Sequence, residues 1–124
     1  GTMLKKSTVT SNMILYCRKW KQTSDFYRNF LELPVNFSCD WFIEFRLTET
    51  SRLSVADENK CTIKSPDKKG ITIALQVPDI DTVWQTVSQK SLNPTEIKPH
   101  PWNAYVFHFF DPEGHRIEIW QSLP

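Results

Sequence analysis

The clearest pattern along the chain is an alternation of apolar and polar positions that occurs twice, about 60 residues apart. Segments 12–17 and 71–77 both place apolar residues at every second position, which is typical of a half-buried strand. After each of these segments, apolar residues recur at helical spacing. The pattern therefore predicts a strand followed by a helix at two places in the chain.

Capping residues place the ends of these two helices. Thr23 or Ser24 can accept the free N–H groups of the first turn, and Pro34 ends the first helical pattern. The predicted apolar stripe of this helix consists of Tyr27, Phe30 and Leu31. Asp79 is the expected N-cap of the second helix, whose stripe consists of Ile80, Val83, Trp84 and Val87.

Shorter strand patterns follow each helix. An extended piece at 35–38 and strands at 41–47 and 52–56 complete the first half, and the polar run 57–69 connects it to the second. In the second half, an extended edge within 91–103 precedes two strands, 104–110 and 115–121, joined by the turn Asp111-Pro112-Glu113-Gly114. We therefore expect an α+β fold made of two βαβββ modules, 12–57 and 70–121, joined by a linker at 58–69.

Composition narrows the classes of partner. With 15 Lys plus Arg against 14 Asp plus Glu, the net charge is +1, which argues against binding to nucleic acid or to an anionic membrane surface. The three cysteines form no Cys-x-x-Cys pair, and no apolar run reaches membrane-spanning length, so we expect a cytoplasmic protein. Residues 1–11 are interpreted as a tag remnant and a flexible N-terminus. Aromatic residues make up 13% of the chain, more than a small core needs, so some rings are expected to line a cavity.

Three motifs on this duplicated scheme carry a family resemblance. They are DFYRNFLELPV after the first strand, IALQVPDID at the start of the second half, and FHFFDPEGHRIEIWQ at its end. Together they resemble the vicinal oxygen chelate superfamily, which includes glyoxalase I, bleomycin resistance proteins, fosfomycin resistance enzymes and extradiol dioxygenases. The resemblance covers residues 12–121 and implies that the two modules form a curved mixed β-sheet cup with helices on its outer face.

The resemblance also implies where a metal would bind. Metal-using members carry His, Gln or Glu at four positions on the inner wall, which correspond here to Asn12, Ser54, Thr72 and Glu118. Only Glu118 has a side chain typical of these ligands, and one carboxylate among neutral amide and hydroxyl groups binds a divalent ion weakly. We therefore predict no metal and no other cofactor, with a divalent metal as the less favoured alternative.

Three interpretations of Glu118 remain open. It alternates with Ile117 and Ile119, so it is expected to face the cup together with Arg116 and Trp120. There it could bind a ligand, pair structurally with Arg116 or Arg46, or serve with His108 in a rebuilt metal site. If the protein is an enzyme, Glu118 is the predicted catalytic residue.

The other candidates follow from the same alternation. Phe42, Glu44 and Arg46 share one face of their strand, while Trp41, Ile43, Phe45 and Leu47 share the apolar face expected to meet the core. His108 could reach the cup or pack as a hydrogen-bonded residue, His115 is expected in the turn, and His100 lies near the rim. The predicted ligand-binding residues are Asn12, Tyr16, Phe42, Glu44, Arg46, Thr72, Gln76, Trp102, His108 and Trp120.

These observations lead to a functional prediction and two alternatives. The prediction is a metal-independent protein, similar to bleomycin resistance proteins, that binds a small aromatic or amphipathic molecule in an aromatic-lined cup. The first alternative is a lyase, isomerase or dioxygenase of the same superfamily that uses Glu118, and the second is an interaction module without a ligand. A homodimer is expected, because the sheets of this fold leave edges that need covering.

Overall fold

The chain forms two compact units, residues 1–66 and 67–124. The computed structural model describes residues 7–64, 71–101 and 103–124, and each unit is considered by itself. Part of the predicted linker, the first residues of the predicted flexible N-terminus and Trp102 lie outside the described residues.

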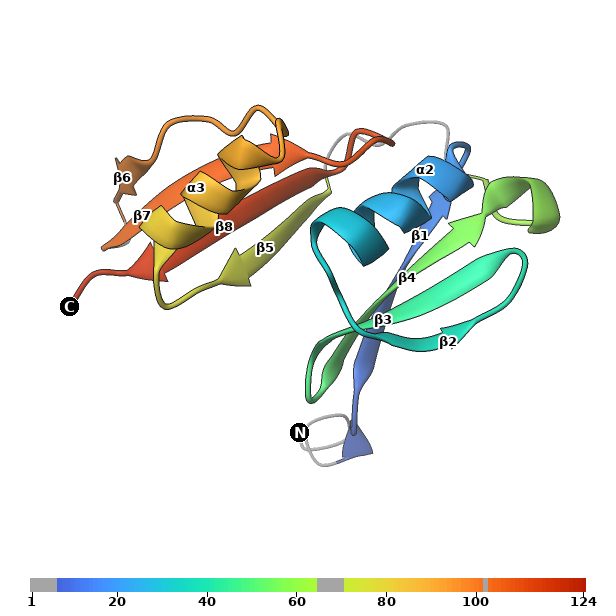
Figure 1. The fold of residues 1–124 in the computed structure, drawn as a ribbon. Coiled ribbons are helices and arrows are strands. Elements are labelled where there is room, and N and C mark those ends of the chain that lie inside the picture. Colours follow the sequence, from blue (N-terminus) through green and yellow to red (C-terminus); the bar gives the residue numbers. More distant parts are fainter. Residues whose placement is uncertain (1–6, 65–70, 102) are drawn as a thin grey trace. The chain divides into compact units, whose positions relative to one another are not determined.

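The first unit is a four-stranded mixed sheet with a helix on one face (Figure 1). Its elements are β1 (Ser11–Cys17), α2 (Trp20–Asp25), the π-helical turn η1 (Phe26–Phe30), β2 (Val35–Ser38), β3 (Phe42–Thr48), β4 (Ser51–Asp57) and the 3-10 turn η2 (Glu58–Lys60). The strand order is β1-β4-β3-β2, with β1 parallel to β4 and the other neighbours antiparallel.

The second unit repeats this arrangement. It consists of β5 (Thr72–Gln76), α3 (Ile80–Gln89), β6 (Lys98–His100), β7 (Ala104–Phe110) and β8 (Arg116–Ser122). The strand order β5-β8-β7-β6 matches that of the first unit, and again the first strand runs parallel to the last. The predicted α+β fold with two βαβββ modules is therefore confirmed.

The core of the first unit lies between its sheet and its helical segment. Leu15, Cys17 and Phe45 are buried on the helix side of the sheet, and Tyr27 packs on Phe45 with ring centroids 6.1 Å apart. Cys17 is fully buried and packs as a small apolar residue of this core.

Three expectations for the first unit were wrong. Its helix begins at Trp20, so Thr23 and Ser24 are buried residues within the helix and cap nothing. Of the predicted stripe, Tyr27 is buried but Phe30 is 46% exposed, and Phe26 takes the buried position instead. Trp41 precedes β3 and is 39% exposed, although the strand alternation placed it with the core residues.

The core of the second unit lies between α3 and its sheet, and Figure 1 shows α3 lying against one face of this sheet. Asp79 caps α3 as predicted, because its carboxylate accepts hydrogen bonds from the N–H of Thr82 at 3.2 Å and from its hydroxyl at 2.7 Å. Ile80 and Val87 are buried on the helix, whereas Val83 and Trp84 are half-buried. Opposite them, β5, β7 and β8 bury Ile73, Phe107, Phe109, Ile117 and Ile119.

A buried polar pair organises the turn between β7 and β8. Asp111 accepts hydrogen bonds from the N–H groups of Glu113 at 3.0 Å and His115 at 2.8 Å, and its second oxygen lies 2.7 Å from His115 Nδ1. Gly114 adopts φ of +99°, which a glycine tolerates without strain. His115 is thus a structural residue of the turn, only 1% exposed.

The open face of each sheet is the face turned away from its helix. On β1, β3 and β4 this face carries Asn12, Ile14, Tyr16, Phe42, Glu44, Arg46, Arg52, Ser54 and Ala56. On β5, β7 and β8 it carries Thr72, Ala74, Gln76, Ala104, Val106, His108, Phe110, Arg116, Glu118, Trp120 and Ser122. The predicted alternation of inward and outward residues is correct in these strands apart from Trp41.

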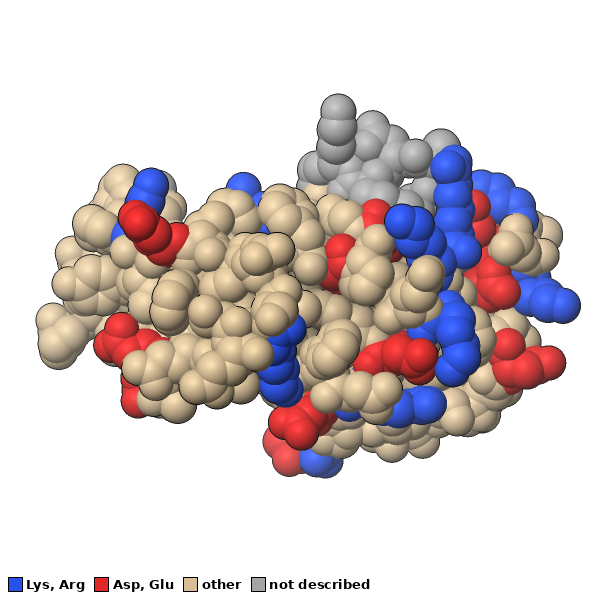
Figure 2. Space-filling model, turned by 45° about the horizontal axis from the view of Figure 1, so that its top comes forward, with Lys and Arg blue, Asp and Glu red and all other residues tan. Residues whose placement is uncertain are grey.

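No helix among the described residues is long and apolar enough to cross a membrane. Lysine, arginine and acidic side chains are interspersed on the face shown in Figure 2.

Candidate functional site

The open face of the second sheet contains a hollow of about 420 Å³. Strand pairing creates it, because Val106 lies opposite Trp120 and Ala104 lies opposite both Ser122 and His100. The lining consists of His100, Ala104, Val106, Glu118, Trp120 and Ser122. This volume falls within the range of small-molecule sites, and the lining combines three apolar with three polar side chains.

Glu118 is the charged group of this hollow. Its side chain is 23% exposed, and its carboxylate lies 3.6 Å from Nη2 of Arg116, two residues earlier on the same face of β8. The predicted structural pairing with Arg116 is therefore present, and Glu118 also lines the hollow. Arg116 contacts the carboxylate from one side only, and 3.6 Å is longer than a hydrogen bond. Glu118 can therefore still attract a hydrogen-bond donor or a cation of a ligand.

His108 lies on β7 directly opposite Glu118, on the open face. Its ring is half-buried and meets Phe110 edge-on, with centroids 5.6 Å apart. Burial lowers the pKa of His108 below its usual value, the positive charge of Arg116 lowers it further, and Glu118 opposes both effects. A neutral imidazole beside a carboxylate at neutral pH can accept or donate one hydrogen bond.

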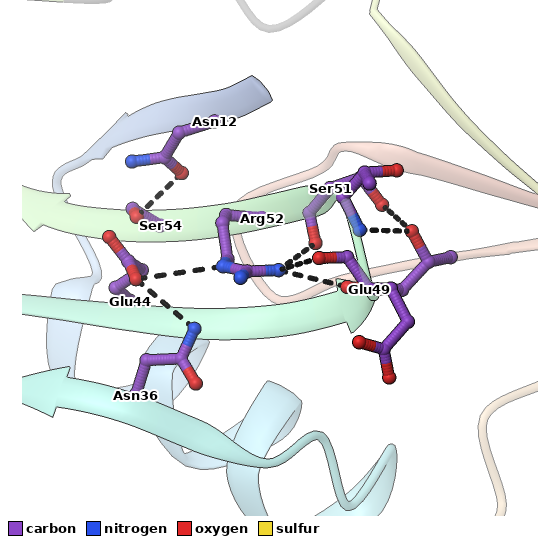
Figure 3. A network of polar contacts seen from close by, with 9 residues as sticks. Asn12, Asn36, Glu44, Glu49, Ser51, Arg52 and Ser54 are labelled. Carbon is purple, nitrogen blue, oxygen red and sulfur yellow. Dashed lines mark hydrogen bonds and ion pairs between the residues drawn. The ribbon is translucent and has the colours of Figure 1, made fainter. Parts of the chain in front are cut away.

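The open face of the first sheet has a polar end, shown in Figure 3. Ser54 is fully buried, and its hydroxyl donates a hydrogen bond to Oδ1 of Asn12 at 2.8 Å. Glu44 accepts a hydrogen bond from Asn36 at 3.2 Å and lies 3.9 Å from Nε of Arg52. Arg46 lies opposite Arg52 in the β3–β4 register.

The other end of this face is aromatic and contains a second hollow, of about 310 Å³. It is lined by Ile14, Tyr16, Trp41, Phe42, Ala56, Lys60, Cys61, Thr62 and Ile63. The indole of Trp41 contacts the ring of Phe42, with centroids 5.4 Å apart.

The structure thus divides the predicted ligand-binding residues among several places. Glu118 and Trp120 line the hollow of the second unit, with His108 opposite Glu118. Tyr16 and Phe42 line the hollow of the first unit, whereas Asn12, Glu44 and Arg46 lie at the polar end of the same face. Thr72 and Gln76 lie on β5 and are not part of the lining of the larger hollow, although Gln76 Nε2 donates to Oγ of the lining residue Ser122 at 3.5 Å. Trp102 lies outside the described residues.

Sequence reasoning missed part of the larger hollow. Ala104 and Ser122 were not considered, and His100 was placed only near a rim. Ala104 and Ser122 continue the strand alternation that placed Glu118 and Trp120 on the open face, so that alternation could have identified them.

The four positions at which related proteins bind metals do not form a fitting donor set here. Asn12 and Ser54 hydrogen-bond to each other, and Thr72 supplies only a neutral hydroxyl. Glu118 is the single ionisable ligand of the four. Among the residues that the structure describes, no three His, Cys, Asp or Glu side chains come together as a metal-binding group.

Comparison with known proteins agrees with this architecture. Residues 10–124 match the glyoxalase-like domain family. The chain belongs to this family. Its match to the family extends from the residue before β1 to the end of the chain, so it includes both open faces.

Similar proteins from bacteria differ in what their names state. The chain is 27% identical to the uncharacterized protein YraH of Bacillus subtilis (strain 168), over 88% of this chain and 94% of that protein. A lactoylglutathione lyase from Agrobacterium tumefaciens superposes with a TM-score of 0.74 at 14% identity, covering 90% of this chain and 91% of the other. TnmS3, an antibiotic binding protein from Streptomyces sp. CB03234, superposes with a TM-score of 0.76 at 14% identity, covering 91% and 94%. At such low identity the solved structures establish the fold alone.

Proposed function

We propose that this glyoxalase-like protein binds a small aromatic molecule in the hollow beside Glu118, and that it does so without a metal. The single observation that carries the proposal is the hollow of about 420 Å³ that places a carboxylate next to an indole. The likeness in fold to an antibiotic binding protein supports binding as one function that this fold performs.

The lining defines the chemistry of the ligand. Trp120, Val106 and Ala104 offer apolar surface, and an aromatic ring gains about 1 kcal/mol from a well-placed aromatic partner beyond the area it buries. Glu118 favours a cationic or hydrogen-bond-donating group, while His100 and Ser122 add polar contacts at the same hollow. We therefore expect a planar aromatic amine to bind better than a neutral molecule of the same shape.

The proposal excludes a metal because of the side chains at the four positions where related proteins bind one. The Ser54 hydroxyl donates to Asn12 Oδ1, and Glu118 is paired with Arg116, so these positions lack the several charged or imidazole ligands that a divalent ion prefers. Elemental analysis of untagged protein is expected to show far less than one equivalent of Zn, Fe, Mn or Ni.

A matched pair of ligands tests the proposed site. Naphthylmethylamine is cationic at neutral pH, whereas naphthylmethanol has nearly the same shape and no charge. Titration calorimetry in the presence of a chelator measures the affinity of both for the wild-type protein and its variants. Glu118→Gln is expected to weaken the amine about fivefold and leave the alcohol nearly unchanged, and Trp120→Ala is expected to weaken both about tenfold.

Arg116→Gln gives the control in the opposite direction. Because the Arg116 guanidinium lies 3.6 Å from Glu118, its removal frees the carboxylate and is expected to strengthen binding of the amine. A variant that merely unfolded could not bind more tightly. Equal losses for amine and alcohol in Glu118→Gln, or binding that disappears with the chelator, would contradict the proposal.

A second candidate function is an enzyme that uses Glu118 as a general base. The observation that favours it is the position of His108 directly opposite Glu118. The imidazole and the carboxylate can each accept or donate a proton to a substrate bound at this surface. Recovery of the ligand after incubation distinguishes the two functions. A binding protein returns the ligand unchanged, whereas an enzyme returns a product that does not form with Glu118→Gln.

A further inference from the structure

The polar end of the first sheet's open face brings two arginines together. Asn12 on β1 and Arg46 on β3 are both in register with Arg52 on β4, so the three side chains form one row across three adjacent strands. Like charges directly opposite each other on a sheet are destabilising. A pair of this kind, Arg46 opposite Arg52, breaks a local rule of sheet stability, which is typical of functional positions.

Arg46 is the available member of this pair. Its side chain is exposed, and among the described residues no carboxylate lies within ion-pair distance of its guanidinium. Arg28, on η1, is another exposed arginine of the same unit, but it lies on the helix side of the sheet. The position of Arg46 on the open face, next to a second guanidinium, therefore distinguishes it from ordinary surface charge.

Arg52 is held in place by its neighbours. Its Nη1 donates hydrogen bonds to the carbonyl oxygens of Thr48 at 2.9 Å, Glu49 at 3.3 Å and Ser51 at 3.2 Å, as Figure 3 shows. Glu44 lies 3.9 Å from its Nε and is the single carboxylate contacting this pair of arginines among the described residues. The row thus has two positive charges against one negative charge, and one guanidinium is already ordered before any ligand arrives.

Asn12 adds a neutral donor to the row. The buried Ser54 hydroxyl donates to Asn12 Oδ1 at 2.8 Å, which directs the oxygen of the amide toward β4 and leaves its NH₂ group without a partner among the described residues. Two guanidinium groups and a free amide NH₂ are all donors, and a planar carboxylate is the group that such donors recognise best.

We propose that Arg46, Arg52 and Asn12 form a binding site for the carboxylate of an organic ligand. The aromatic hollow at the other end of the same face suggests the rest of that ligand. Asn12 and Tyr16 are four residues apart on β1, a separation of about 13 Å along a strand. An aromatic carboxylate of this length can place its ring against Tyr16 and Phe42 and its charge at the arginine row. This site belongs to the first unit and does not depend on the function proposed for the hollow beside Glu118.

Solution NMR with biphenylbutanoate and its neutral amide, biphenylbutanamide, tests the site directly. The carboxylate is expected to shift the side-chain signals of Asn12 Nδ2 and Arg46 Nε, while the exposed side-chain amide of Asn29, on the helix side, stays unchanged. Arg46→Gln is expected to weaken the carboxylate about fivefold and to leave the amide analogue unaffected.

Two further variants separate a specific site from general attraction of an anion. Arg28→Gln makes the same change of charge on the opposite face and is expected to alter the affinity less than twofold. Glu44→Gln removes the one opposing carboxylate and is expected to strengthen binding, a gain that a damaged fold cannot produce. Equal losses for Arg46→Gln and Arg28→Gln, no change in Arg46→Gln, or the absence of binding at millimolar biphenylbutanoate would each overturn the proposal.

Discussion

The buried pair of Asp111 and His115 offers the sharpest prediction on stability. The Asp111 side chain is completely buried, and it accepts two backbone hydrogen bonds and faces the imidazole of His115 at 2.7 Å. Asp111→Ala leaves these three donors without an acceptor in a site that excludes water. Removing one partner of a buried polar pair costs about 3–5 kcal/mol, so we expect a loss of this size in the free energy of unfolding.

Asp111→Asn is the matched control for this substitution. The amide oxygen can still accept the N–H groups of Glu113 and His115, and its NH₂ can donate to His115 Nδ1 in the tautomer that carries the proton on Nε2. We therefore expect Asp111→Asn to cost only about 1–2 kcal/mol. Urea unfolding followed by circular dichroism measures both variants. A loss below about 1 kcal/mol for Asp111→Ala, or equal losses for both variants, would refute the reasoning.

Three further predictions concern charge and assembly. The pKa of His108 is expected below 6.5 by NMR titration, because burial and Arg116 both lower it, and Arg116→Gln should raise it. With a lowered pKa, His108 binds fewer protons in the folded state than in the unfolded state. The free energy of unfolding should therefore decrease as pH drops from about 6.5 through the folded pKa, and His108→Gln should remove this dependence. Hydrogen bonds from Thr82 lower the pKa of Asp79, so its stabilisation of α3 is present above pH 3.8 and is lost as pH falls through the folded pKa; Asp79→Ala should flatten the acid limb of the unfolding profile. We also propose a homodimer, which light scattering would detect as twice the 14.6 kDa chain mass, whereas a monomer mass at micromolar concentration would contradict it.

Local sequence signals predicted some parts of the fold correctly. Asp79 caps α3 through a hydrogen bond to Thr82, three residues away, and such a contact is visible in a short window of sequence. The strand alternation likewise placed Trp120 on the same face as Glu118. Successive side chains on a strand point to opposite sides, so residues two apart share a face.

Contacts between distant residues account for what the sequence did not reveal. The first helix begins at Trp20, whose indole N–H donates to the carbonyl oxygen of Val55 at 2.9 Å, 35 residues away in the chain. No local pattern contains that contact, so Thr23 and Ser24 were mistaken for caps. The position of His100 in the larger hollow depends in the same way on the register of β6 with β7, in which His100 meets Ala104.

Native mass spectrometry of untagged protein purified from cells tests the central claim most directly. If the hollow beside Glu118 binds an organic molecule without a metal, part of the wild-type protein should carry an added organic mass. That mass should be absent or much reduced in Trp120→Ala, and no metal should accompany it. The account would be contradicted by close to one equivalent of a divalent transition metal that is lost in Glu118→Ala, or by an organic mass that Trp120→Ala retains in full.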